Sequence, residues 1–392
     1  RSVPFYRERL DDGALTEETW ARVAILKRRE VQDAGAKLHS TAIPKSHGKI
    51  GVAYTSGSTS SPLMIVKTAL SRHFWQVFAL RDELWHGRDF SAKTAVIKRD
   101  RSAKSGATEG RRLDSWGPPV SLCYPTGPAA LLDVRADPYE QLAWLAREEP
   151  AYLLSQAGNL KALARAALEA GVRLPSLRQA RGLGEVLEDE TRALVRQAWG
   201  VEITDCYSAE EIGYMALQCP KHAHLHVQSE SVLLEVLDDA GHTVPPGGVG
   251  RVVVTPLHNF AMPLIRYEIG DWAEVGEACP CGRGLPVLTR ILGRTRNAVV
   301  LPSGSRRHAL ISTDPLHKIT AIVQYQLVQK SLEEIEFRLV ARRPLTQEEE
   351  TTLTQLVAER FGHPFAVRFV YVEEIKRAAS GKFESFISEI AQ

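Results

Sequence analysis

The sequence has few cysteines and methionines and no long apolar run. Five cysteines in 392 residues are too few for a disulfide scaffold. No apolar stretch approaches the ~20 residues that a membrane-spanning helix needs. The first residues, Arg1–Pro4, have no signal-peptide core. We therefore expect a cytoplasmic protein with no membrane association.

An excess of charge of one sign is also missing. The chain has 49 Lys and Arg against 47 Asp and Glu, which gives a net charge of +2. No basic stripe is present to attract a nucleic acid, so we expect no nucleic-acid partner. Hydrophobic residues make up 44% of the chain, a normal share for a globular protein long enough to form two or three domains.

The hydrophobic periodicity changes along the chain. Before about residue 230, strand and helix patterns alternate, which predicts an α/β fold with parallel strands. Strand patterns dominate after that point and predict a β subdomain, and the last 95 or so residues predict a small α+β unit. We expect helices at 71–86, 188–198 and 346–361, a broken helical stretch at 138–172, a loop at 101–120, and strands at 333–341 and 366–372.

A hydroxyl-rich loop, Tyr54–Pro62, follows the apolar run 50–53. A strand that leads into such a loop can point backbone N–H groups and hydroxyls at phosphate oxygens. The loop lacks the Gly-Lys pair of the Walker pattern. The same composition is typical of a solvated turn, so the residues alone leave both interpretations open.

Two motifs with acidic residues lie later in the chain. Glu210 and Glu211 lie beside Tyr207, where they fit a Mg²⁺ site with a stacked base or the exposed first turn of a helix. Asp271 follows Gly270, where it fits a ligand of a ribose diol or a residue that caps a turn.

Cysteines and histidines gather in two short segments. Cys219 and His226 belong to the first, and Cys279 and Cys281 form a C-x-C pair in the second. Three thiolates and one imidazole suit a tetrahedral, structural Zn²⁺ site. His222 or His224 is an alternative to His226, and a set of free surface thiols and histidines is the alternative to a metal site.

Together these motifs resemble the adenylate-forming (acyl-CoA synthetase-like) superfamily. The similarity is to its phenylacetate–CoA ligase branch, which includes capsule-biosynthesis-type ligases and some zinc-binding members. The motif order extends from Pro4-Phe5-Tyr6-Arg7 to Gly381-Lys382. The resemblance implies a large N-terminal domain at 1–293, a hinge at 294–297 and a small mobile lid domain at 298–392.

The resemblance also implies an ATP site. The β- and γ-phosphates would be bound by Thr55, Ser56, Gly57, Ser58 and Thr59. Gly184 and Glu185 would line the adenine pocket, and Tyr207 would stack on adenine. Asp271 would bind the ribose, and Arg294 would contact the ribose or a phosphate. Glu211 falls on the Mg²⁺-binding glutamate, and Glu210 occupies a hydroxyl position. Lys382 resembles the lysine that bridges the substrate carboxylate and the α-phosphate.

The implied reaction is ATP-dependent activation of a carboxylic acid to an acyl-adenylate, followed by transfer to CoA. A carrier protein or an amine as acceptor and a non-catalytic binding protein are alternatives, and we expect a monomer or homodimer. Trp75, Phe78, Trp116 and Tyr214 suggest an aromatic acid, although aromatics on a helix are also typical of a core.

The chain departs from the family pattern at four positions. Ser60 replaces a second glycine of the loop. Leu63 replaces a lysine that many superfamily loops carry after proline, although the phenylacetate–CoA ligase branch often lacks it. Arg296 and Asn297 occupy the hinge, where an acidic residue is usual. The stiffer loop and the altered hinge motivate the non-catalytic alternative.

Overall fold

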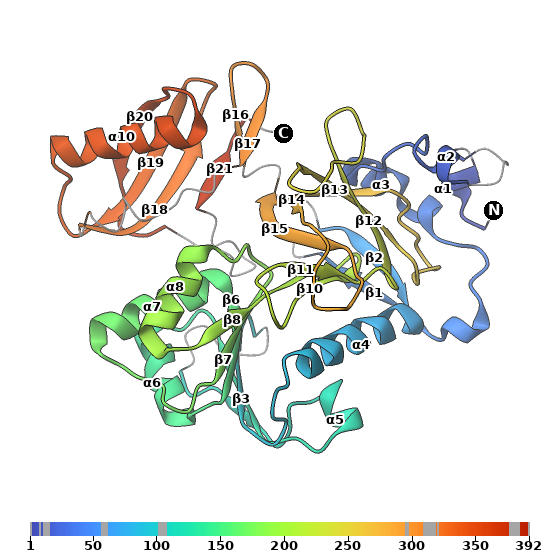
Figure 1. The fold of residues 1–392 in the computed structure, drawn as a ribbon, viewed down its shortest axis with the longest axis horizontal. Coiled ribbons are helices and arrows are strands. Elements are labelled where there is room, and N and C mark those ends of the chain that lie inside the picture. The colour runs from blue at the N-terminus through green and yellow to red at the C-terminus, as the bar shows by residue number, and fades with distance from the viewer. Residues whose placement is uncertain are drawn as a thin grey trace.

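The computed structural model describes residues 2–7, 9–10, 16–55, 62–100, 108–294, 298–308, 319, 321–375 and 385–390. Within these ranges the chain forms mixed α/β layers around three hydrophobic cores (Figure 1). None of the helices in this described part is long and apolar enough to cross a membrane.

The first large sheet has six strands in the order β4-β5-β3-β6-β7-β8. Five of them run parallel, and β4 is an antiparallel edge strand. Their bounds are β3 (Thr94–Lys98), β4 (Arg111–Leu113), β5 (Ala129–Asp133), β6 (Tyr152–Gln156), β7 (Gln179–Leu183) and β8 (Glu202–Thr204). The α/β architecture predicted for the chain before residue 230 is confirmed.

Helices cover this sheet from two sides. The helices α6 (Pro138–Glu148), α7 (Ala157–Ala170) and α8 (Asp189–Trp199) pack on one side, and α4 (Ala69–Trp85) lies on the other (Figure 1). The prediction of a broken helical stretch at 138–172 is wrong in one respect, because the strand β6 lies between its two helices. Pro150 has no amide hydrogen to continue a helix, and the apolar residues after it pair with β3 and β7 in the sheet centre.

The predicted loop at 101–120 also contains structure. Residues 101–107 lie outside the described ranges, but β4 pairs with β5, and Val120 begins the short helix α5 (Val120–Cys123). The side chain of Arg112 holds β4 to α6 through hydrogen bonds of 2.9–3.2 Å to the Glu148 carboxylate. Such a contact between distant segments leaves no local sequence pattern.

The second large sheet is antiparallel and has the order β12-β13-β14-β15-β11-β10-β9. Its strands are β9 (Cys206–Ala209), β10 (Gly213–Gln218), β11 (Leu225–Val227), β12 (Val232–Leu237), β13 (Val249–Pro256), β14 (Tyr267–Val275) and β15 (Val287–Arg294). The strand β2 (Met64–Thr68), which forms a hairpin with β1 (Ile50–Tyr54), shares a core with this sheet, as do α1 (Pro4–Arg7), α3 (Arg28–Ala34) and η1 (Gly35–Leu38). The N-terminal region also contains α2 (Glu17–Trp20) and η2 (Lys45–His47).

The last part of the chain has its own mixed sheet, β20-β19-β18-β21, with a buried core of Phe337, Leu353 and Phe361. Its elements are β16 (Ala298–Val300), β17 (Arg306–His308), β18 (Ile322–Gln329), β19 (Glu334–Ala341), α10 (Gln347–Phe361), β20 (Ala366–Tyr371) and β21 (Phe386–Ser388). The predicted strands and helix are confirmed here. The hinge at 294–297 stays a prediction, since residues 295–297 lie outside the described ranges.

Candidate functional site

The neck of the hydroxyl-rich loop lies between β1 and β2. The Thr55 amide donates to the Leu63 carbonyl oxygen at 3.0 Å, and the Leu63 amide donates to Thr55 Oγ1 at 2.9 Å. These bonds hold the two ends of the loop together directly after a strand. Ser56, Gly57, Ser58, Thr59 and Ser60 lie outside the described residues, so their predicted phosphate contacts stay predictions.

Tyr207, Asp271 and Arg294 come from three strands of the antiparallel sheet, β9, β14 and β15, and meet in one group. The Tyr207 hydroxyl donates to Asp271 Oδ2 at 2.8 Å, and Arg294 Nε lies 3.5 Å from Asp271 Oδ1. Asp271 and Arg294 are direct partners in the β14–β15 register. Burial and the Asp271 carboxylate raise the pKa of Tyr207 well above its usual value, so this phenol stays protonated and donates.

Glu210 and Glu211 lie in the tight turn between β9 and β10. The alternative of a first helical turn is therefore wrong. Glu211 is 6% exposed, and its Oε1 lies 3.6 Å from Arg28 NH1. Glu210 pairs with Lys67 at 2.8 Å, and Lys67 also lies over the Trp75 ring.

The predicted adenine-pocket segment follows β7. Gly184 has φ +68°, in the left-handed region that favours glycine. Glu185 Oε2 accepts from the Gly158 amide at 2.7 Å, in the first turn of α7. A Cβ on Gly293 would lie 3.3 Å from Val186, so this segment packs close to the end of β15, which carries Arg294. Lys382 lies outside the described residues.

A cavity of about 280 Å³ opens beside the glutamate turn. Its walls combine apolar, aromatic and charged groups, among them Val52, Lys67, Trp75, Glu210 and Asn259. It is close to the ordinary size of a small-molecule pocket, which starts at about 300 Å³.

The four aromatics suggested for an acid pocket do not form one group. Trp75 and Tyr214 lie together, with ring centroids 5.4 Å apart. Trp116 instead packs against Phe90 and Tyr152. Phe78 is a core residue, 2% exposed.

The two cysteine and histidine segments lie together in the structure, and the zinc ion stays a prediction. Cys219 Sγ lies 3.9 Å from Cys279 Sγ, and Cys281 Sγ lies 3.3 Å from His226 Nε2. Thiolates bound to one tetrahedral zinc at about 2.3 Å would lie about 3.8 Å apart, so these separations fit the ion. Hydrogen bonds to Cys281 outweigh its partial burial and lower the pKa of this thiol to about 7.

His224 adds a fifth donor to this cluster. The ligand atoms of Cys219, His224, His226 and Cys279 all lie within 4.8 Å of one another. The Nε2 atom of His224 is buried and has no hydrogen-bond partner among the described residues, as a metal-binding nitrogen would. His222 is exposed and stacks on His224 at 5.1 Å.

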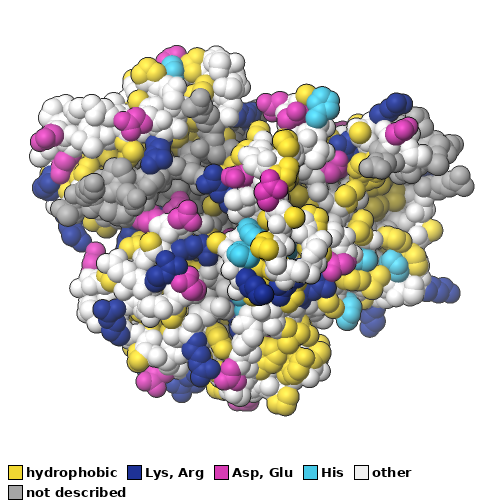
Figure 2. Space-filling model, viewed as in Figure 1, with side chains coloured by type: hydrophobic (Ala, Val, Ile, Leu, Met, Phe, Trp, Pro, Cys, Tyr) yellow, Lys and Arg dark blue, Asp and Glu magenta, His cyan; other side chains and the backbone are white. Residues whose placement is uncertain are grey.

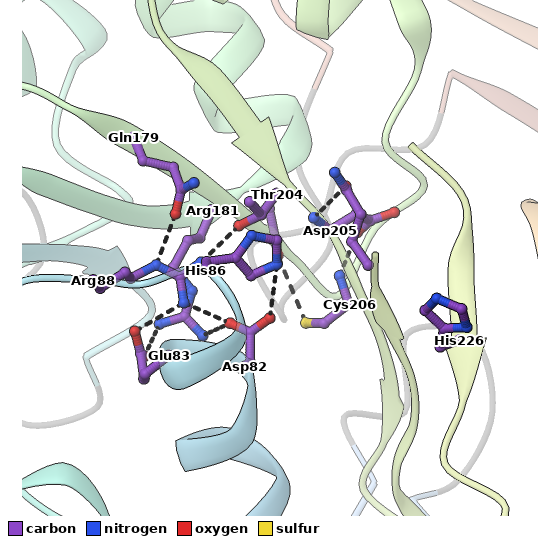
Figure 3. A network of polar contacts seen from close by, with 12 residues as sticks. Asp82, Glu83, His86, Arg88, Gln179, Arg181, Thr204, Asp205, Cys206 and His226 are labelled. Carbon is purple, nitrogen blue, oxygen red and sulfur yellow. Dashed lines mark hydrogen bonds and ion pairs between the residues drawn. The ribbon is translucent and has the colours of Figure 1, made fainter. Parts of the chain in front are cut away.

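A buried charge network holds α4 against the parallel sheet (Figure 3). Arg88 donates to Asp82 at 2.8 Å and to Glu83 at 2.9 Å, and Arg181 from β7 pairs with the same two carboxylates. Two arginines against two carboxylates leave no net charge, so the network positions α4 and offers no spare cation to a substrate. Burial raises the pKa of the adjacent Asp205 to about 7.

Two cations beside the glutamate turn were not predicted, namely Arg28 and Lys67. Arg28 belongs to the N-terminal helix α3, far from every recognised motif in the sequence. Lys67 is 7% exposed in the strand β2. The sequence did contain a signal that Lys67 is buried, because it is a lone lysine within an apolar strand pattern.

Known proteins share this architecture and parts of this sequence. Residues 305–389 match the family model described as the CapK C-terminal domain. A segment of 165 residues, 40% of the chain, is 31% identical to phenylacetate–coenzyme A ligase of Thermus thermophilus and spans 37% of that relative's length. A solved structure of 2-hydroxyisobutyryl-CoA ligase, in complex with R3-HIB-AMP, superposes with a TM-score of 0.72 at 20% identity, covering 99% of this chain and 86% of that one. The chain therefore has the fold of this CoA ligase over nearly its whole length.

A further solved structure shares the fold over less of its length. The anthranilate CoA ligase AuaEII, in complex with anthranoyl-AMP, has a TM-score of 0.60 at 19% identity. That match covers 85% of this chain and 64% of the other. The sequence match and the C-terminal family model each cover less than half of this chain.

Proposed function

We propose that the protein activates a carboxylic acid with ATP to an acyl-adenylate and then transfers the acyl group to CoA. The observation that carries this proposal is that Tyr207 and Arg294 both contact Asp271, because residues from three separate predicted ATP-site motifs meet in one group. The 31% identical relative is a phenylacetate–CoA ligase, which supports the same reaction here.

The chemistry has two steps. A carboxylate oxygen of the acid attacks the α-phosphorus of ATP, the bond to the bridging oxygen of the β-phosphate breaks, and pyrophosphate leaves. The CoA thiol then attacks the acyl carbonyl, the bond to AMP breaks, and the thiol proton passes to solvent. Both steps depend on positioning and on stabilisation of phosphoryl charge.

The chain's residues have distinct roles in this proposal. The Tyr207 ring stacks on adenine, and the Gly184–Glu185 segment lines the adenine pocket. Asp271, oriented by Tyr207 and Arg294, accepts hydrogen bonds from the ribose diol. Lys382 contacts the substrate carboxylate and the α-phosphate during the first step, while the loop that starts at Thr55 binds the outer phosphates.

Two metal ions belong to the proposal. Glu211 would hold Mg²⁺, which neutralises phosphate charge when bound. Its buried carboxylate, next to the neck of the loop, fits this role. Cys219, Cys279 and Cys281, with His226 or His224, would hold a structural Zn²⁺ that ties the loop after β14 to β10 and β11.

The identity of the acid, the cellular location and the oligomeric state are also proposals. The cavity beside Trp75 and Lys67 is the candidate for the acid's side chain, and an aromatic acid stays a prediction. Acidic and basic side chains are interspersed on the face shown in Figure 2, with no continuous basic stripe there. We propose a cytoplasmic monomer or homodimer without a nucleic-acid or membrane partner.

The test is acid-dependent ATP–pyrophosphate exchange across a panel of aryl and aliphatic acids. Exchange with at least one acid supports adenylation, and exchange with none favours a non-catalytic binding protein. Mass spectrometry after addition of CoA then detects the thioester. An acyl-adenylate that accumulates without a thioester would show that the acceptor is a carrier protein or an amine.

Replacing Tyr207 tests the adenine contact. Tyr207→Phe keeps the ring but loses one hydrogen bond to Asp271, so we expect KM for ATP to rise only about 5-fold. Tyr207→Ala loses the stacking surface, worth about 1–3 kcal/mol, and should raise KM for ATP roughly 10- to 100-fold. Equal effects of the two substitutions on initial-rate kinetics would contradict the stacking role.

A further inference from the structure

Arg28 lies between the neck of the hydroxyl-rich loop and the glutamate turn. Its NH2 donates to Thr55 Oγ1 at 3.1 Å, and its NH1 lies 3.6 Å from Glu211 Oε1. It also acts on the Tyr267 hydroxyl, whose pKa burial raises to about 12 while Arg28 opposes the rise. One guanidinium from α3 thus touches the ends of three separate strands.

Lys67 and Arg28, the two cations beside the glutamate turn, differ in their distance from the carboxylate that each faces and in their exposure. Lys67 is bound to Glu210 at 2.8 Å and is 7% exposed. Arg28 stands at a longer distance from its carboxylate and keeps 28% of its side chain exposed. An ion that binds Glu211 would therefore replace an ion pair of 3.6 Å, and the guanidinium would stay beside the neck of the loop through its bond to Thr55 Oγ1.

The loop neck itself supplies no cation. Leu63 stands where many superfamily loops carry a lysine, and it is 4% exposed in the hydrophobic core. Polyphosphate held at the neck still needs positive charge, because desolvated phosphate oxygens repel one another. An arginine suits the task, since its planar fork can bind phosphate oxygens in pairs.

We propose that Arg28 binds the pyrophosphate portion of ATP, its β- and γ-phosphates, and so supplies from the N-terminal segment the cation that the loop lacks. This inference rests on the proposed function. In the absence of nucleotide, Arg28 neutralises Glu211. With Mg²⁺ and ATP bound, the carboxylate contacts the metal and the guanidinium contacts the outer phosphates.

Arg28→Gln and Arg28→Lys test the proposal, with Arg29→Gln as the matched control. Arg29 is the next residue on the same helix, its side chain is 91% exposed, and it pairs with Asp33 at 3.9 Å. Binding of ATP, AMP and inorganic pyrophosphate is measured by isothermal titration calorimetry on the full chain, with and without Mg²⁺. Steady-state kinetics give KM for ATP and kcat.

We expect Arg28→Gln to weaken ATP and pyrophosphate binding about 10- to 100-fold, as loss of charge-assisted hydrogen bonds predicts. AMP lacks the outer phosphates, so its affinity should stay within about 3-fold by the same contact argument. KM for ATP should rise more than kcat falls, Arg28→Lys should restore part of the affinity, and Arg29→Gln should match the native protein.

Two results would overturn the proposal. One is an equal loss of ATP and AMP affinity in both Arg28 variants, which would mark a purely structural residue. The other is unchanged pyrophosphate affinity in Arg28→Gln. A native chain that binds neither ATP nor AMP would instead contradict the proposed function itself, so the two failures are distinguishable.

Discussion

Replacing Lys382 with alanine is expected to lower acid-dependent ATP–pyrophosphate exchange about 10³-fold. Attack of a carboxylate on the α-phosphate brings two anions together and builds negative charge on the phosphoryl oxygens. A lysine that contacts both groups offsets this charge where it develops, so its loss acts on the barrier more than on ATP binding. KM for ATP should change much less than kcat.

The matched control is Lys330→Ala in the same predicted domain. Lys330 pairs with Glu389 at 2.6 Å, and its replacement should leave exchange unchanged. The thioester-forming step, measured from a supplied acyl-adenylate, should also survive in Lys382→Ala, because no α-phosphate is attacked there. Exchange within about 10-fold of the native rate would remove Lys382 from the adenylation step, given the size expected for such a contact.

Local patterns were sufficient for much of the fold. Thr68 caps α4 by accepting from the Ser71 amide, and Thr346 caps α10 in the same manner with Glu349. Such signals lie within a few residues of one another and can be found in one sequence. The strand β6 was missed because its position depends on β3 and β7, which pair with it from distant parts of the chain.

The candidate site divides in the same way. Tyr207 and Asp271, which contact each other in the structure, could be proposed from the sequence because each belongs to a compact motif whose order along the chain is informative. Arg28, Arg88 and Arg181 were not predicted, because none of these arginines belongs to a recognisable sequence motif. Their importance arises only when folding brings them to carboxylates elsewhere in the sequence.

The glutamate turn shows how topology decides between local alternatives. Adjacent carboxylates after a short apolar run suit a helix N-terminus as well as a turn. Ala209 and Gly213 pair across an antiparallel hairpin, which forces the residues between them into a turn. The turn places Glu211 beside Arg28 and Glu210 beside Lys67, so the two carboxylates have different partners.

Loss of the proposed zinc ion is expected to destabilise the β subdomain. Cys279→Ser should lower bound zinc from one equivalent to well below one, measured by elemental analysis of protein purified without chelator. Cys279 lies in the loop between β14 and β15 and is only half-buried, so its own packing contributes little to stability. A fall in Tm of that variant would therefore report the metal and not a cavity.

The size of this effect follows from what the ion cross-links. Structural zinc contributes about 10–16 kcal/mol in isolated zinc fingers, and a site on a preformed sheet needs only part of that energy. A loss of about 3 kcal/mol would lower Tm by roughly 6–12 °C in a domain of this size. Cys123→Ser is the matched control, because Cys123 is exposed and far from the cluster in sequence.

If the native protein holds no zinc, or if both serine variants melt alike, the thiols are not metal ligands. His224→Ala and His226→Ala, compared in the same assay, then show which imidazole completes the site.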